Sequence, residues 1–360
     1  MSNQAEESIR AFPEQNGNFI GNPTDYDGCS RFLADTGYGN FHVHLTLNSR
    51  RDADPDDVWV FMGHRMLTAG IPRFKGSCEV SGNVHVGLFP SSDPDRRIAE
   101  KLAVSLIAPS LFLTDLKISE IDCPTIHITG DFSACAYPAS FAYHPLETAA
   151  GWGQMLPCFL TGKAAVADHA RPGLTLKSYR KEGTHAQLLR ELKEEDYVLI
   201  QFDPGNTVSE NPAGVDSFCD ELAERIREIQ DCGSRPVLVT PLAGNTWWGG
   251  GYQDLKQAHA DAIKRLGDKM DIPVLDLHDK TASAIRNLER KETSVLYLSG
   301  DSQKTNDCGA YFAARIIASE IRRTCGWTEG YQTLAEAIDK HALMDSDPAR
   351  QVFAYYRSRA

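Results

Sequence analysis

The residues of this chain that are best suited to chemistry gather in one short segment, residues 124–138, with the sequence PTIHITGDFSACAYP. It contains a carboxylate, Asp131, and a hydroxyl group, Ser133, two residues apart. A serine hydroxyl is a nucleophile once a base removes its proton, and a carboxylate can orient that base. Residues 300–306, GDSQKTN, also contain a carboxylate, Asp301, next to a serine and close to Lys304. These two segments are therefore the first candidates for a functional site.

A strand must position the first segment. The short apolar run from Ile126 to Thr129 lies between Pro124 and the pair Gly130-Asp131. A run of this length, bounded by proline and glycine, predicts a buried strand that ends in a loop. In an α/β sheet, the loop at the carboxyl end of a strand is where ligands and catalytic residues gather. Asp131, Phe132 and Ser133 are expected in that loop.

Apolar strand candidates and helical patterns alternate from about residue 124 onward. This alternation predicts an α/β fold with a mostly parallel sheet and helices on both faces. The predicted strands are Thr125–Thr129, Ala164–Ala167, Tyr197–Phe202, Pro236–Thr240 and Pro273–Asp276. The predicted helices are His185–Leu192, Val215–Ile229, Asp254–Leu266, Lys280–Leu288 and Cys308–Arg323.

The first third of the chain has a different pattern. Polar and apolar residues alternate in short bursts at 41–47, 58–63 and 84–89, separated by glycine, proline and aspartate. Such period-two runs are typical of antiparallel strands, here of a small β-sandwich. We therefore divide the chain into an accessory β-sandwich at 1–120, an α/β domain at 121–330 and a helical tail at 331–360.

Composition excludes several classes of protein. The chain has 360 residues and a net charge of −12, which argues against non-specific nucleic-acid binding. The amino terminus lacks the pattern of a secretory signal, and no apolar run is long enough for a bilayer, so neither a membrane nor export is expected. The nine cysteines form no CxxC pair, which favours reduced thiols and a cytoplasmic location. No metal site is expected, because the histidines lack ligand spacing in sequence: His127, His144, His169 and His185.

Several segments, in order, resemble blocks of the SGNH (GDSL-type) hydrolases, and more closely the rhamnogalacturonan acetylesterase-like branch of that superfamily. The resemblance covers roughly residues 120 to 325. It rests on GDFSA at 130–134, GWGQMLPCFL at 151–160, VADHARPGLTLKSY at 166–179, DYVLIQF at 196–202, PVLVTP at 236–241 and GDSQKTNDCGAYFAA at 300–314. The resemblance implies a flavodoxin-like α/β/α sandwich preceded by a galactose-binding-like β-sandwich, ester hydrolysis on acetylated pectic oligosaccharides, and no cofactor.

The resemblance also assigns catalytic positions, and this chain departs from them. Phe132 stands where the family has its nucleophilic serine, and Ser133 follows one residue later. Asp301 occupies the aspartate position of the last block, but Lys304 replaces the histidine. A phenyl ring cannot attack a carbonyl, and lysine stays protonated near neutrality unless burial lowers its pKa. If Ser133 substitutes as nucleophile, a local twist must aim it into the cleft, because neighbouring positions of an extended chain face opposite sides.

The oxyanion and sugar-binding positions carry similar expectations. Gly173 matches the family glycine whose N–H points at the oxyanion, and Asn206 lies one residue beyond the position of the asparagine donor. Aspartate occupies position 168, where the branch usually has asparagine. Further candidates for binding an oligosaccharide are a carboxylate, a lysine and three tryptophans: Asp131, Lys177, Trp152, Trp247 and Trp248. Arg171 and Lys304 offer additional positive charge for a uronate.

Three functions stay open. The first is a catalytically impaired SGNH protein that binds a small-molecule or oligosaccharide ligand, because the scaffold motifs stand beside a replaced serine, histidine and asparagine. The second is an active carbohydrate O-acetylesterase that uses Ser133 with Asp301 or Lys304, since serine–lysine pairs occur on other folds. The third is an interaction or scaffold protein that acts through the β-sandwich.

Overall fold

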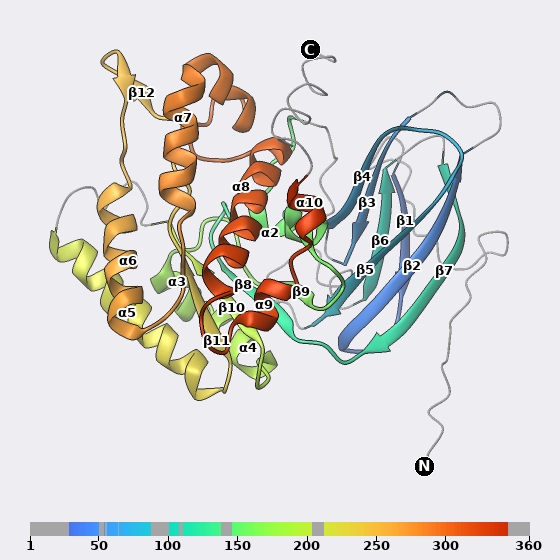
Figure 1. Cartoon of the computed structure of the whole chain (residues 1–360), viewed down its shortest axis with the longest axis horizontal. Helices are drawn as coiled ribbons and strands as arrows, with labels where there is room; N and C mark the ends of the chain where they lie inside the picture. Colours follow the sequence, from blue (N-terminus) through green and yellow to red (C-terminus); the bar gives the residue numbers. More distant parts are fainter. Residues whose placement is uncertain are drawn as a thin grey trace.

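The computed structural model describes residues 29–49, 54, 56–63, 65–87, 101–107, 111–137, 146–203 and 212–344. One parallel sheet with helices around it lies beside a group of antiparallel strands (Figure 1). In the described part of the chain, no helix has both the length and the apolar character needed to cross a bilayer.

The parallel sheet has five strands in the order β14-β11-β10-β8-β9. They are β8 (Thr125–Gly130), β9 (Ala165–Asp168), β10 (Tyr197–Gln201), β11 (Arg235–Val239) and β14 (Val274–Leu275). Every neighbouring pair is parallel, so all carboxyl ends meet at the same edge. The α/β prediction and its five strands are confirmed, with bounds that differ by one residue at one or both ends.

Helices connect these strands or follow the last of them. They are α2 (Trp152–Met155), α3 (Leu176–Lys181), α4 (Thr184–Glu191), α5 (Pro212–Asp231), α6 (Gln257–Met270), α7 (Leu277–Thr293), α8 (Asp307–Glu320), α9 (Gln332–Glu336) and α10 (Lys340–Met344). Helix α7 begins three residues before the predicted start, because the side chain of Asp276 caps it by accepting from the N–H of Asp279. The predicted helix at 308–323 ends as a π-helical turn, Ile321–Cys325.

Alternating residues of the sheet face two different apolar cores. On β10, Tyr197 and Leu199 belong to a cluster with α2 and α8, and this cluster also contains Ile128 of β8. Val198 and Ile200 point the other way and pack with α3, α4, α5 and α6. Because side chains of a strand alternate between faces, helices cover the sheet on both sides. Buried strands of this kind read as continuous apolar runs, as the sequence does here.

The antiparallel strands form two sheets, ordered β1-β6-β3-β4 and β5-β2-β7. The strands are β1 (Cys29–Ala34), β2 (Gly39–Ser49), β3 (Asp56–Met62), β4 (Met66–Phe74), β5 (Ser77–Val86), β6 (Leu102–Ile107) and β7 (Leu111–Ile121). Every second residue of β2 from Val43 to Leu47 is fully buried. These residues share one apolar cluster with Val58 and Val60 of β3, so the predicted alternation places side chains of both sheets in one core.

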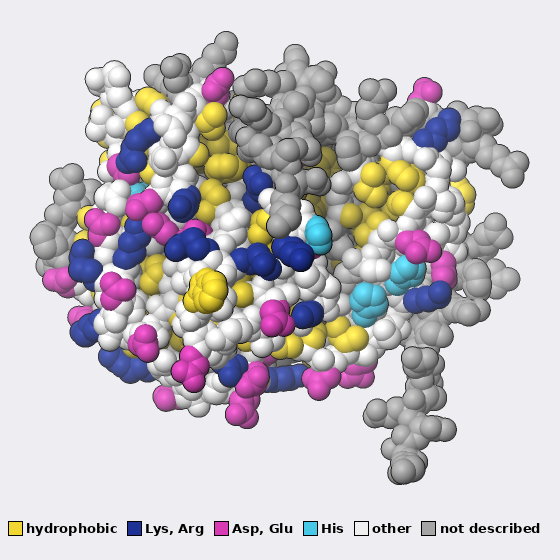
Figure 2. Space-filling view, in the orientation of Figure 1, with side chains coloured by type: hydrophobic (Ala, Val, Ile, Leu, Met, Phe, Trp, Pro, Cys, Tyr) yellow, Lys and Arg dark blue, Asp and Glu magenta, His cyan; other side chains and the backbone are white. Residues whose placement is uncertain are grey.

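The antiparallel strands pack closely against the parallel sheet. Met66 and Leu67 of β4 belong to the same core cluster as Leu156 and Phe159, which follow α2. A polar link lies nearby, since the Asn40 side-chain amide donates to the carbonyl of Cys123 (2.9 Å) and to Thr125 Oγ1 (3.0 Å). On the face shown in Figure 2, basic and acidic side chains intermingle over the helical part.

Candidate functional site

The site lies at the edge of the sheet where β8 and β10 end. Glycines at this edge let two backbone segments approach each other closely. A Cβ atom on Gly130 would lie 2.1 Å from the carbonyl oxygen of Gln201. No side chain fits at that distance, so the turn after β8 sits directly against the end of β10. Gly153 is equally confined, with a Cβ only 2.3 Å from the carbonyl of Ala134. These contacts hold residues 131–135 in one place.

Ser133 belongs to a buried polar network with Asp131, Trp152 and Gln201. The indole N–H of Trp152 donates to Gln201 Oε1 (2.7 Å), which fixes the orientation of that amide. Gln201 Nε2 then donates to Ser133 Oγ (2.7 Å), and the serine hydroxyl donates to Asp131 Oδ1 (2.9 Å). Ser133 is 1% exposed. Its hydroxyl therefore points into the protein and uses both its donor and an acceptor position within this network.

Asp131 is also buried, and its neighbours are charged. Burial, followed by the negative charge of Asp203, raises the pKa of Asp131 to about 6. The backbone N–H of Asp203 donates to Asp131 Oδ2, and the Asp203 carboxylate pairs with the buried ammonium of Lys256. Lys256 Nζ also donates to the carbonyl of Leu242 (2.9 Å). This arrangement holds two carboxylates together and offsets part of their repulsion.

Phe132 lies between the buried residues Asp131 and Ser133 in the sequence and is itself half-buried. The hydroxyl of Tyr137 donates to the carbonyl of Phe132 (3.4 Å), and burial raises the pKa of Tyr137. The Tyr137 N–H donates to Gln154 Oε1 (3.1 Å). The loop is thus held from both sides, with a phenyl ring at the position that corresponds to the family nucleophile.

Asp301 and Lys304 take part in hydrogen bonds other than those of the Ser133 hydroxyl. Asp301 Oδ1 accepts from the backbone N–H groups of Gln303 (2.8 Å) and Lys304 (3.0 Å), so this carboxylate closes its own turn. The Lys304 side chain is exposed. The sequence predicted a pair between Ser133 and one of these residues, but among the described residues Ser133 Oγ contacts Asp131 and Gln201 instead.

The two expected oxyanion donors are Gly173 and Asn206. Gly173 is exposed, with φ at +81°, so it serves a turn that favours glycine. Asn206 lies outside the described residues.

Asp168 is buried at the end of β9, where Oδ1 accepts from the N–H of Ala170 (2.9 Å). Burial raises the pKa of Asp168 well above its usual range.

The residues expected to bind sugar differ in burial and lie on different elements. Trp152 is fully buried, so the prediction of a ring face for stacking is corrected to a packing role with an N–H partner in Gln201. Trp248 is 53% exposed on β12 (Trp247–Trp248), which pairs with β13 (Gly251–Tyr252). Trp247 is half-buried, and its N–H donates to Asn245 Oδ1 (2.8 Å). Lys177 is exposed on α3.

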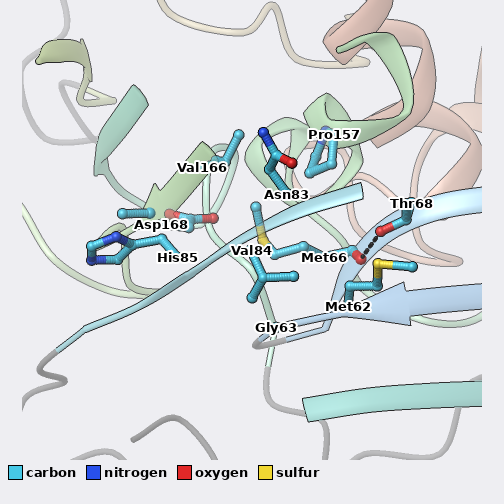
Figure 3. Close-up of a pocket in the computed structure, with 11 residues that line it drawn as sticks. Met62, Gly63, Met66, Thr68, Asn83, Val84, His85, Pro157, Val166 and Asp168 are labelled. Carbon is cyan, nitrogen blue, oxygen red and sulfur yellow. Dashed lines mark hydrogen bonds between the residues drawn. The ribbon is translucent and has the colours of Figure 1, made fainter. Parts of the chain in front are cut away.

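A small cavity of about 20 Å³ lies at the junction between the antiparallel strands and β9 (Figure 3). Asp168 and His85 lie at one end of it and Met62 and Thr68 at the other, as Figure 3 shows. This volume holds about one water molecule. It is too small for a sugar.

A buried histidine cluster was not expected from the sequence. His127 Nδ1 lies 2.9 Å from His169 Nε2, and Glu191 Oε2 lies 3.8 Å from the same His169 atom. Burial lowers the pKa of His127 and that of His169, the latter to about 3. Spacing rules for metal ligands apply to ligands from one loop or helix, whereas these residues come from β8, the end of β9 and α4. Of the histidines considered above, His144 lies outside the described residues.

Comparison with known proteins agrees with the sequence motifs. The chain matches no protein-family model. It is 26% identical over 221 residues to uncharacterized esterase YxiM of Bacillus subtilis, covering 59% of this chain and 56% of that protein. It is 28% identical over 150 residues to rhamnogalacturonan acetylesterase RhgT of the same organism, covering 41% of this chain and 65% of that protein. The chain therefore spans less than two thirds of the length of either relative.

Among solved structures, the crystal structure of the YxiM protein of Bacillus subtilis aligns over 82% of this chain and 80% of its own, with 21% identity and a TM-score of 0.49.

Proposed function

From the relationship of this chain to esterases of the rhamnogalacturonan acetylesterase-like branch of the SGNH hydrolases, we propose a carbohydrate-esterase-like protein that binds its ligand without hydrolysing it through a serine triad. The ligand class is an acetylated pectic oligosaccharide, by analogy with the named relative. We also propose that residues 1–120 form an accessory β-sandwich, 121–330 the SGNH-type domain and 331–360 a helical tail, in a cytoplasmic protein.

The observation that carries the proposal is the environment of Ser133. A nucleophilic serine needs access to the substrate carbonyl and a base that takes its proton and later returns it. Ser133 is almost fully buried, and its hydroxyl donates to Asp131 and accepts from Gln201. The residue one position earlier is Phe132, which has no group that can attack.

The base position supports the same proposal. Lys304 is exposed, whereas the Ser133 hydroxyl is buried. Asp301 is engaged with the backbone of its own turn. Loss of the nucleophile or the base in a serine hydrolase lowers turnover by about 10⁶-fold, and further losses add little.

Trp248 is the proposed contact for a sugar ring, because its side chain is exposed on β12, which follows β11 in the chain. Trp327 is also exposed, at 90%, but lies after α8 in another part of the chain. The two tryptophans therefore form a matched pair of exposed rings, one proposed to bind the sugar and one serving as its control.

The test measures hydrolysis and binding on the same sample. We expect no release of acetate from acetylated rhamnogalacturonan oligosaccharide, no labelling by a fluorophosphonate probe, and measurable binding by calorimetry. Trp248→Ala should weaken binding by about two- to tenfold, as an aromatic contact is worth ~0.5–1.5 kcal/mol. Trp327→Ala should leave it unchanged.

Two results would contradict the proposal. Enzymatic release of acetate that disappears in Ser133→Ala, but not in the exposed-serine control Ser302→Ala, would favour the active esterase. In that case Asp131, whose carboxylate lies 2.9 Å from the serine hydroxyl, is the base within reach. Failure of both hydrolysis and binding would instead favour an interaction role for the antiparallel sheets.

A further inference from the structure

We propose that His127, His169 and Glu191 bind one zinc ion at the junction between the parallel sheet and the antiparallel strands. One ligand atom from each of these residues lies within 4.8 Å of the other two. His127 is in β8, His169 directly follows β9, and Glu191 is the last residue of α4. The proposed ion is independent of the carbohydrate site and of the esterase question.

The spacing of the ligand atoms fits a tetrahedral ion. Zinc bonds of about 2.0–2.1 Å to nitrogen and oxygen place tetrahedral ligand atoms about 3.3–3.4 Å apart. His127 Nδ1 and His169 Nε2 are 2.9 Å apart, and His169 Nε2 and Glu191 Oε2 are 3.8 Å apart. Each of these two distances differs from the tetrahedral value by about half an ångström, and the ligand atoms of His127 and Glu191 lie within 4.8 Å of each other.

Asp196 orients the His127 ring as a ligand. Asp196 Oδ2 lies 3.2 Å from His127 Nε2. Asp196 is itself fixed, because its carboxylate accepts from the backbone N–H groups of Thr125 (2.8 Å) and Lys193 (2.9 Å). A carboxylate is an acceptor, so His127 carries its proton on Nε2 and directs the Nδ1 lone pair into the cluster. Carboxylate–histidine pairs of this kind support zinc ligands.

His169 can bind the zinc ion without its imidazole ring losing a proton. Since His127 Nδ1 is an acceptor, His169 Nε2 donates to it when no cation is bound. Zinc would replace this hydrogen bond, and the His169 proton would move to Nδ1 of the same ring. Both imidazoles remain neutral, which is the form that binds metal.

His85 is the candidate for the fourth ligand. Asn40 uses its Nδ2 group to donate to Cys123 and Thr125, so its Oδ1 accepts from His85 Nδ1 (2.8 Å). The other nitrogen, His85 Nε2, then presents a lone pair toward Glu191 Oε2 at 3.5 Å. Two acceptors facing each other in a buried place favour a cation between them.

The ligand set indicates zinc and a structural role. Neutral imidazoles with one carboxylate are a ligand set that zinc accepts, and a closed, buried site is typical of structural zinc. The four side chains come from β5, β8, the end of β9 and α4. An ion held by all four would join the antiparallel strands to both the sheet and a helix of the α/β part.

The test uses the full chain after treatment with a chelator. We expect one zinc per chain by elemental analysis and calorimetry, a higher melting temperature with zinc, and the absorption bands of tetrahedral Co²⁺ when cobalt is added. Glu191→Gln and His169→Gln should lose this binding. Asp196→Asn should weaken it by about 10–100-fold. His44→Gln, on β2 with an exposed contact to Ser81, is the control and should bind as the unmodified chain does.

Two outcomes would overturn the proposal. One is an unmodified chain that takes up no zinc and gives no tetrahedral cobalt spectrum. The other is uptake that persists at full affinity in Glu191→Gln and His169→Gln, which would put the ion elsewhere. If a ligand variant fails to fold, the stoichiometry and cobalt spectrum of the unmodified chain decide.

Discussion

Replacement of Ser133 by alanine separates a structural serine from a catalytic one. Alanine keeps the backbone N–H that donates to Asp131 Oδ1 (2.9 Å) but removes the hydroxyl. Gln201 Nε2 then loses its acceptor at 2.7 Å in a place that is fully buried. The variant therefore leaves a buried polar group without a partner, and we expect it to be less stable.

The size of the effect follows from that lost partner. Leaving a buried hydrogen-bonding group unsatisfied costs about 1–3 kcal/mol. For a domain of about 150–250 residues, each kcal/mol lowers the melting temperature by about 2–4 °C. We therefore expect a fall of about 2–12 °C for Ser133→Ala. The exposed control Ser302→Ala should change the free energy of unfolding by less than about 0.5 kcal/mol.

Thermal unfolding and urea titration of the full-length protein, measured beside acetate release, provide the assay. An unchanged melting temperature in Ser133→Ala would refute the structural role. If acetate release were also lost, the serine would be a nucleophile and the network described above would open in solution.

Three more predictions concern the same edge of the sheet. Trp152→Phe should lower the free energy of unfolding by about 1–3 kcal/mol in urea titration, because Gln201 Oε1 loses the indole donor at 2.7 Å. The pKa of Asp131 is raised to about 6, so stability should fall as pH rises from about 4 to 6, and Asp131→Asn should reduce this slope in urea midpoints across that range. Lys256→Met breaks the buried pair with Asp203 and should cost about 3–5 kcal/mol by the same titration.

The arrangement of the α/β part could be predicted from the sequence because its strands are buried on both faces. Runs such as Tyr197–Gln201 are apolar throughout, and glycine or proline marks their ends. The start of α7 at Leu277 was harder, since the cap is made by Asp276 at the end of a two-residue strand. The pattern of apolar residues says little about where a short strand gives way to a helix.

The site was only partly predictable for a different reason. The position of Phe132 after β8 followed from the motif, but the direction of the Ser133 hydroxyl depends on Gln201, which is 68 residues away in sequence. The same holds for His127 and His169, separated by 42 residues and brought into contact by adjacent parallel strands. Contacts of this kind are set by strand order, which no local spacing rule contains.

The packing of Met66 and Leu67 against Leu156 and Phe159 has a practical consequence for anyone who truncates this protein. A fragment that begins near residue 121 would keep the whole parallel sheet yet expose the apolar surface that β4 now covers. Exposed apolar surface of this sort favours aggregation. Expression of the α/β half alone should therefore yield insoluble material unless Leu156 and Phe159 are first replaced by polar residues.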